Sequence, residues 1–277
     1  MAQLRSSAAI ATMLGASFQT YGIVSTHRSQ YRVAERLHLD ILENPLDVGG
    51  KVCSLINSPG YFRALELVEA WCDDTDAHAH VVEMRGLFSD CDLILDDRPW
   101  DVRYDMSKCT WRWVRHIFSN SIGLKTPRKG IGLHKRWGDM SIMTPHDDPL
   151  TPQRSTPIDK AADLLRKMRE CGIHDELSVY MEWHNTTMLR GLGEPYRIVD
   201  TGDSFDDLVD LASNRLMILD LSSWTVLAHN MAGGGVTVVP DIDQFGITWH
   251  DNGVNNVLRW EELLTIPCSE LLTLYGD

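Results

Sequence analysis

Side chains that can bind an anion gather in "IGLHKRWGDM", residues 131–140. An apolar run ends there, and His134, Arg136 and Asp139 follow. If residues 130–135 form a strand, these side chains lie at or just beyond its carboxyl end. An arginine at that point can offer a planar fork of N–H donors to a diphosphate, with a geometry that lysine does not reproduce. The alternative is a structural salt bridge between Arg136 and an acid such as Asp139.

A second candidate anion site lies in residues 206–235, "DDLVDLASNRLMILDLSSWTVLAHNMAGGG". The pattern predicts a helix, a buried strand and a Ser-Ser turn that begins another helix. Ser222 is typical of an N-cap, and the backbone N–H groups of a first helical turn bind anions without special side-chain chemistry. The alternative is that Ser222 and Ser223 only cap their helix.

Three further segments carry polar side chains that could do chemistry. Residues 73–80, "DDTDAHAH", could bind a metal, with His78 and His80 on one face if the chain is extended, but a solvated acidic loop is favoured. Residues 111–118, "WRWVRHIF", suggest base stacking or a partly buried amphipathic helix, and the acidic chain favours the helix. Glu182, in "SVYMEWHN", ends a predicted strand and could contact a ligand.

The elements that must position these side chains alternate regularly after residue 123. We predict strands at 130–137, 177–183, 196–201, 215–221 and 235–241, and helices at 157–171, 204–214 and 222–234. Strands and helices that alternate with short loops form a parallel sheet covered on both faces. Ligands bind such sheets at the carboxyl ends of the strands, which is where both candidate anion sites fall.

The first half has a less regular pattern. Residues 4–15, 31–45 and 60–74 are predicted as helices, 18–25 as a strand, and 78–89 and 91–97 as shorter extended or helical pieces. A helix-like stretch at 106–122 closes this mixed α/β region, and the basic connector "GLKTPRKG" follows it. The sequence therefore predicts two α/β domains, residues 1–122 and residues 123–277.

Composition limits the partners and the compartment. The 277 residues carry a formal net charge of −13, which disfavours nucleic acid and anionic membranes as partners. The six cysteines are scattered without a C-x-x-C pair, which argues against a zinc site and gives no disulfide framework, although one or two bridges in a secretory compartment are an alternative. The opening residues resemble neither a signal peptide nor a membrane anchor, so a cytoplasmic location is expected. If an upstream segment is missing, the secretory pathway is the alternative.

Residues 132–139, "GLHKRWGD", resemble the "G-x-H-x-R-R-[TG]-D" signature of the fucosyltransferases that use GDP-fucose. This superfamily contains the α1,2-, α1,6- and protein O-fucosyltransferases and has the GT-B fold. The run from Asp207 through Ala212 to Ser222-Ser223 is similar to the superfamily's "D-x-x-x-L-[SA]…[IV]-x-x-x-SS" segment. The start of the chain, with Gln3 and Arg5, is similar to the "G-x-[NQ]-x-[LF]-R" loop and first helix.

The resemblance implies a GT-B-like fold, with two Rossmann-like α/β domains that face each other across a cleft. Residues 1–122 would then bind the acceptor, and residues 123–277 the nucleotide sugar. The donor-binding residues that it implies are His134 and Asp207 for the guanine, Arg136 for the diphosphate, and Ser222, Ser223 and the amide of Trp224 for the phosphates. The implied reaction is an inverting transfer of fucose from GDP-fucose to a glycan or protein hydroxyl, with no cofactor and no essential metal.

Two positions depart from the family pattern. Trp137 replaces the second arginine of the signature, and Thr144 stands near the place where the α1,6 branch has an acid that serves as acceptor base. The nearest replacement bases are His146, Asp147 and the adjoining acid in "TPHDDP", although a surface turn is the alternative. A catalytically inactive nucleotide-binding relative that acts as an interaction module is therefore the alternative function. Neither G-x-G-x-x-G nor G-x-x-x-x-G-K-[ST] occurs, which argues against other nucleotide-binding enzymes.

Overall fold

The computed structural model describes residues 2–16, 19–20, 40–41, 49–55, 60–73, 77–95, 129–136, 155–181, 186–240 and 255–276. The chain divides into two compact units, Met1–Gly123 and Leu124–Asp277.

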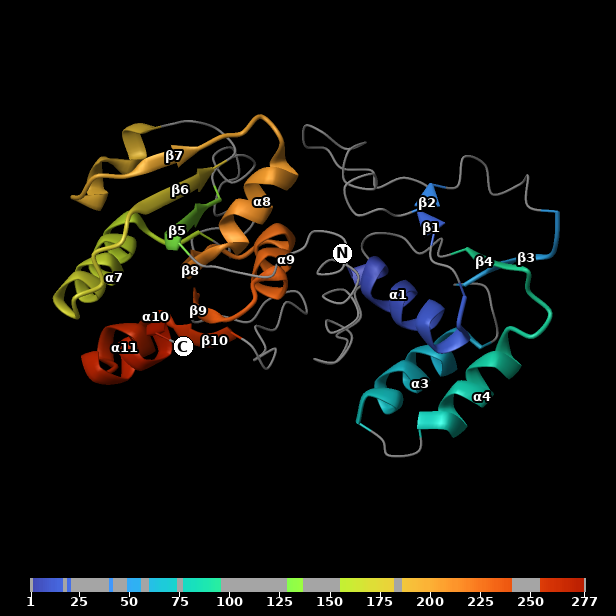
Figure 1. The fold of residues 1–277 in the computed structure, drawn as a ribbon. Helices are drawn as coiled ribbons and strands as arrows, with labels where there is room; N and C mark the ends of the chain where they lie inside the picture. Colours follow the sequence, from blue (N-terminus) through green and yellow to red (C-terminus); the bar gives the residue numbers. More distant parts are fainter. Residues whose placement is uncertain are drawn as a thin grey trace, which may run out of the picture. The chain divides into compact units, whose positions relative to one another are not determined.

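The second unit is built on a sheet of six parallel strands (Figure 1). The strands are β5 (Lys129–Lys135), β6 (Leu177–Met181), β7 (Arg197–Val199), β8 (Asn214–Leu219), β9 (Gly235–Val239) and β10 (Asn255–Arg259), in the order β10-β9-β8-β5-β6-β7. The chain thus adds β6 and β7 on one side of β5 and then returns to add β8, β9 and β10 on the other. The predicted α/β class and the predicted parallel sheet are confirmed.

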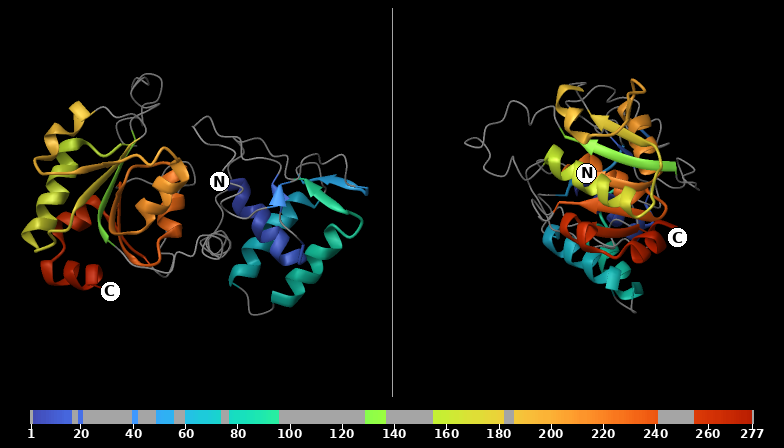
Figure 2. Two further views of the ribbon diagram at one scale, coloured as in Figure 1. Left: turned by 45° about the horizontal axis from the view of Figure 1, so that its top comes forward. Right: turned by 90° about the vertical axis from the view of Figure 1, so that its left-hand side faces the viewer.

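Helices cover both faces of this sheet (Figure 2). On one side lie α8 (Ser204–Ala212) and α9 (Ser223–Met231), and on the other lie α7 (Ile158–Glu170), α10 (Trp260–Thr265) and α11 (Cys268–Gly276). A short 3-10 helix, η3 (Thr186–Leu192), connects β6 to β7. The predicted helices at 157–171, 204–214 and 222–234 correspond to α7, α8 and α9. The sequence analysis did not identify β10, α10 or α11.

Alternation along β5 assigns its side chains to the two faces. Ile131 and Leu133 are fully buried in the core that contains the apolar side of α7. A Cβ added at Gly132 would come within 2.8 Å of Leu211 of α8, so this position lies on the opposite face. His134 and Arg136 continue the Gly132 side of the strand, toward α8 and α9.

In the first unit, the described residues form three helices around a small core and two pairs of short parallel strands. The helices are α1 (Ala2–Leu14), α3 (Tyr61–Asp73) and α4 (Ala77–Leu87), and the paired strands are β1 (Gln19–Thr20) with β2 (Asp40–Ile41) and β3 (Val52–Ser54) with β4 (Leu93–Leu95). Ala9, Met13, Leu67 and Met84 are buried where the helices meet. The predicted helices at 4–15 and 60–74 are confirmed. Of the predicted strand at 18–25, residues 19–20 form β1, and the rest lies outside the described residues. The helix-like stretch at 106–122 lies outside the described residues.

One predicted helix of the first unit is wrong where it can be checked. Asp40 and Ile41, inside the predicted helix 31–45, pair with Gln19 and Thr20 as a parallel strand. The apolar residues of "LHLDI", residues 37–41, recur at every second position as well as fitting a helical repeat. A short apolar run of this kind does not distinguish helix from strand, and pairing with a distant segment decides it.

The described residues contain two disulfides, one in each unit. Cys53 is bonded to Cys91 beside β3 and β4, and Cys171 at the end of α7 is bonded to Cys268 at the start of α11. The expectation that the cysteines give no disulfide framework is corrected, because the bridges that were left as an alternative are present. Sequence spacing did not reveal them, since the partners are 38 and 97 residues apart.

Candidate functional site

The sheet has a topological switch point between β5 and β8. Because β6 lies on one side of β5 and β8 on the other, the loops that leave the carboxyl ends of β5 and β8 diverge to opposite sides. In open parallel sheets, this divergence leaves a crevice in which ligands bind. His134 and Arg136 stand at the end of β5, and Ser222 to Trp224 follow β8. Both candidate anion segments therefore flank the same switch point.

His134 contacts the first turn of α9. Its ring centroid lies 5.0 Å from that of Trp224, with an interplanar angle of 33°. Its Nδ1 is buried and has no hydrogen-bond partner among the described residues. Burial lowers the pKa of His134 to about 4; nearby Asp220 opposes this shift, and the positive charges of Arg136 and Lys135 add to it. At neutral pH, the His134 ring is therefore uncharged, and it can donate or accept a hydrogen bond with a nucleobase.

Arg136 reaches across the switch point. Its guanidinium Nη1 donates to the carbonyl of Leu221, 2.9 Å away, in the turn between β8 and α9. Its backbone N–H donates to Oδ2 of Asp220 at 2.6 Å. The side chain is half-buried, so the cation lies beside the start of α9 with part of its surface open.

The start of α9 is fixed by a reciprocal cap. Ser222 Oγ accepts a hydrogen bond from the Thr225 N–H, and Thr225 Oγ1 accepts one from the Ser222 N–H, both at 3.1 Å. This capping box leaves the Ser223 and Trp224 amides as first-turn N–H groups with no partner inside the helix. Such groups carry the positive end of the helix dipole and bind phosphate. Next to them lie the Arg136 cation and the His134 ring.

Asp207 is hydrogen-bonded at the start of α8 and to the segment before it. It lies in the first turn of α8, and its Oδ1 accepts a hydrogen bond from the backbone N–H of Thr201 at 2.9 Å. Burial raises the pKa of Asp207, against the hydrogen bonds from Thr201. The described contacts join Arg136 to the turn before α9 and His134 to Trp224. Those of Asp207 run to the chain that precedes α8.

Several predicted site residues cannot be compared with the structure. Asp139, His146, Asp147 and Glu182, as well as Trp137 and Thr144 of the departures, lie outside the described residues. Gln3 and Arg5 lie in α1, but their side chains are not described. The salt bridge between Arg136 and Asp139 likewise stays a prediction.

The metal site considered for residues 73–80 required His78 and His80 to lie in an extended segment, and they do not. His78 and His80 belong to helix α4, in which residues two apart point to different sides, and not to an extended segment. Within the described ranges, no group of three or more histidine, cysteine or acidic side chains is arranged to hold a metal ion.

Two residues at the switch point were missed by the sequence analysis. Lys135 and Asp220 are both buried and form an ion pair, with Nζ and Oδ2 3.6 Å apart. Each stands at or just after the end of a buried strand, where a charged side chain needs a partner. The order of the strands, which makes these two strand ends neighbours, was not available from the sequence.

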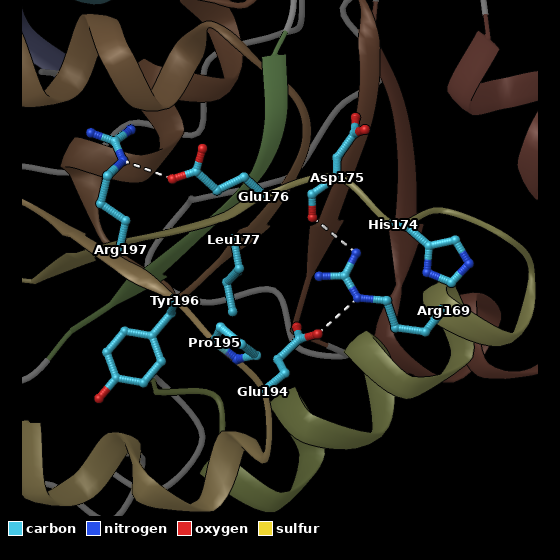
Figure 3. A pocket seen from close by; sticks show the side chains of 9 residues that line it. All are labelled: Arg169, His174, Asp175, Glu176, Leu177, Glu194, Pro195, Tyr196 and Arg197. Atoms are coloured by element: carbon cyan, nitrogen blue, oxygen red, sulfur yellow. Dashed lines mark hydrogen bonds and ion pairs between the residues drawn. The ribbon is translucent and has the colours of Figure 1, made fainter.

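A pocket of about 430 Å³ lies at the opposite, amino-terminal edge of the sheet (Figure 3). Its walls come from the ends of the segments that enter β6 and β7. The arginines in it are already paired: Arg169 Nε lies 2.7 Å from Glu194 Oε2, and Arg197 Nε lies 3.3 Å from Glu176 Oε1. Both arginines of this pocket are thus held by carboxylates.

Comparison with known proteins gives similarity to solved structures only. No protein-family model matches the chain, and no curated protein matches it. The structure of POFUT1 in complex with GDP-fucose is similar over 87% of this chain and 94% of that chain, with 9% sequence identity and a TM-score of 0.48. The E. coli heptosyltransferase WaaC with ADP-2-deoxy-2-fluoro heptose is similar over 99% of this chain and 96% of that chain, with 9% identity and a TM-score of 0.43. At these values the similarities do not by themselves assign a function.

The described helices include none that is long and apolar enough to cross a membrane.

Proposed function

We propose that the chain is a glycosyltransferase that binds a nucleoside-diphosphate sugar at the carboxyl ends of β5 and β8. The observation that carries this proposal is the meeting of three groups at one switch point. The Arg136 guanidinium hydrogen-bonds the turn before α9, the His134 ring contacts Trp224, and Ser222 caps the same helix. A cation and helix amides suit a diphosphate, and a neutral ring beside an aromatic one suits a base.

The chemistry follows from the charge that appears when the donor is cleaved. The acceptor hydroxyl oxygen attacks the anomeric carbon, the bond from that carbon to the phosphate oxygen breaks, and the diphosphate leaves with the electron pair. Arg136 and the first-turn amides of α9 would bind this developing charge more tightly than the ground state. They would supply the stabilisation that a metal ion supplies in other transferases, so we expect no essential metal or cofactor.

The finer assignment is an inverting transfer of fucose from GDP to a glycan or protein hydroxyl. Its support is the resemblance of residues 132–139 and 207–223 to the signatures of the GDP-fucose-dependent enzymes. Asp147 or His146 would accept the proton of the acceptor hydroxyl. Asp207 would contact the guanine, with residues 1–122 on the acceptor side of a GT-B-like cleft. Within residues 123–277, Arg136 would be the main catalytic cation.

A second candidate function is a nucleotide-binding relative without turnover. The observation in its favour is Trp137, which removes one of the two cations of the family signature. Binding of GDP without consumption of GDP-fucose would support this alternative over the enzyme.

The two disulfides also bear on where the protein works. Bonds such as Cys53–Cys91 and Cys171–Cys268 form and persist in oxidising compartments and are rare in the cytosol. We therefore propose the secretory pathway or the cell exterior in preference to the cytoplasmic location expected from the sequence.

The experiment that tests the donor site is a thermal-shift panel of GDP, UDP, ADP and their sugars. We expect GDP to raise the melting temperature most and Arg136→Ala to remove the rise. In a transfer assay, the loss of one such donor costs on the order of a hundredfold in kcat. Arg197→Ala is the matched control, since it removes an arginine paired with Glu176 at the opposite edge of the same sheet.

Three outcomes would contradict parts of the proposal. A rise that is selective for UDP would overturn the choice of GDP. Equal loss of binding in Arg136→Ala and Arg197→Ala would mean that the arginine acts through stability alone. No response to any nucleotide would overturn the donor site itself.

A further inference from the structure

The buried ion pair at the end of β5 links three separate segments of the chain. Lys135 is 3% exposed and Asp220 is fully buried. Lys135 Nζ also donates to Ser155 Oγ at 2.5 Å and to the carbonyl of Thr156, in the segment that leads into α7. A buried charge is costly unless it is paired and hydrogen-bonded, and here Lys135 is both.

The carboxylate of Asp220 is the centre of this network. Oδ2 accepts hydrogen bonds from the backbone N–H of Arg136 at 2.6 Å and from Ser155 Oγ at 3.1 Å. Oδ1 accepts one from the backbone N–H of Thr156 at 2.6 Å. Backbone donors that point at both oxygens fix the carboxylate, and the carboxylate in turn fixes the main chain where β5 ends.

The main chain of Asp220 reaches the other half of the site. Its carbonyl accepts a hydrogen bond from Thr225 Oγ1 at 2.6 Å, and Thr225 is the residue that closes the capping box with Ser222. One residue is therefore bonded both to the amide of Arg136 and to the first turn of α9. These are the two anion-binding elements of the proposed site.

We infer that Asp220 is the positioning residue that aligns the Arg136 guanidinium with the α9 amides, with Lys135 as its counter-charge. This inference rests on the proposed function for what Arg136 binds, but the alignment itself concerns the free protein. Asn at position 220 keeps the shape of the side chain but turns an NH₂ group toward a backbone N–H, so that two donors face each other. It also leaves the buried Lys135 without a counter-charge.

The test is a double-mutant cycle on GDP binding with Asp220→Asn, Arg136→Ala and the double variant. If Asp220 acts through Arg136, Asp220→Asn weakens GDP binding on the order of tenfold, the loss expected when a charge-assisted hydrogen bond is misaligned. The same substitution then has little further effect in the Arg136→Ala background. Glu194→Gln is the matched control, because it breaks the half-buried pair with Arg169 at the other edge of the sheet and should leave GDP binding unchanged.

A measurement without nucleotide separates this inference from the proposed function. Two-dimensional NMR of the free protein should show that Asp220→Asn shifts the Arg136 and Thr156 amides and the Trp224 indole, whereas Glu194→Gln does not. Unshifted resonances would overturn the inference even if GDP binds. If the wild type binds no nucleotide, the proposed function is wrong. The NMR comparison then still tests whether Asp220 aligns Arg136 with the start of α9.

An additive cycle would also overturn the inference, since it would mean that Asp220 affects binding through stability rather than through Arg136. If Asp220→Asn does not fold, Ser155→Ala takes its place, because it removes one donor from Oδ2. The same non-additivity with Arg136→Ala, at a smaller fold-change, is then the expected result, and additivity is the contradicting one.

Discussion

His134 is kept uncharged by the protein around it, and this has a consequence for stability. Its pKa is lowered to about 4 in the folded chain, from 6.5 when unperturbed, mainly by burial. Between these two values the unfolded chain binds a proton that the folded chain does not. The contribution of His134 to the free energy of unfolding is therefore retained above pH 6.5 and lost as the pH falls toward 4.

We expect the free energy of unfolding to fall between pH 6.5 and pH 4 by up to about 3 kcal/mol more in the wild type than in His134→Phe. Phenylalanine keeps a ring against Trp224 but cannot titrate. Denaturant unfolding at a series of pH values measures the difference. Parallel curves for the two proteins, or an NMR titration of His134 near pH 6.5, would contradict the expectation.

At this scale, the sequence predicted the residues whose types and spacing are distinctive. His134, Arg136 and Ser222 stand out because a strand end and a helix start are each readable from local pattern. Lys135 and Asp220 do not, because a charged residue at a strand end has many local explanations. What makes them partners is the pairing of β5 with β8, which joins residues 85 positions apart, and no local signal encodes that pairing.

The close packing of α8 on β5 explains why residue 132 is a glycine. An added Cβ would lie 2.8 Å from Leu211 Cδ1 and 2.9 Å from Asn214 Nδ2, so α8 packs directly on β5 at this position. Asn214 cannot easily move away, since its Nδ2 donates to the Tyr180 hydroxyl at 2.9 Å and to the Asp210 carbonyl at 2.9 Å. The glycine that begins the G-x-H pattern thus has a packing reason that is independent of any ligand.

We predict that Gly132→Ala lowers the free energy of unfolding by about 1–3 kcal/mol, the usual cost of overpacking a core. Gly86→Ala is the control, because that glycine lies in α4 with nothing within 4 Å of an added Cβ. It should be neutral or stabilising by up to about 1 kcal/mol. Chemical denaturation measures both, and an unchanged stability in Gly132→Ala would refute the packing argument.

Elements with a strong, single periodicity were predicted, and the others were not. The buried residues of α7, Ala161, Leu164, Leu165 and Met168, follow one helical stripe, and β6 and β9 are buried throughout. In contrast, Asp40 and Ile41 belong to a run that fits two periods, so only the partner strand decides its state. β10, α10 and α11 were not predicted from the sequence.

At the scale of the molecule, the disulfides should contribute differently to the two units. The Cys171–Cys268 bond closes a loop whose ends are 97 residues apart in sequence, and it joins the end of α7 to the start of α11. In the chain-entropy model, such a loop is worth about 5 kcal/mol, and the 38-residue separation of Cys53–Cys91 about 4 kcal/mol.

We expect the double variant Cys171→Ser, Cys268→Ser to lower the free energy of unfolding of the second unit by up to about 5 kcal/mol and to leave the first unit unchanged. Cys53→Ser with Cys91→Ser should do the reverse. Hydrogen exchange followed by mass spectrometry resolves the two units separately. If both double variants affected both units equally, the assignment of one stabilising disulfide to each unit would be wrong.

The central position of β5 has a consequence for the order in which the protein is made. β5 is the first strand of its sheet to leave the ribosome, yet its neighbour β8 follows only after α7, β6, β7 and α8 have been synthesised. A nascent chain that ends before residue 214 can pair β5, β6 and β7 but has neither Asp220 nor the start of α9. If GDP binds at the site proposed above, it can therefore assist only the late steps of folding, after this edge of the sheet is complete.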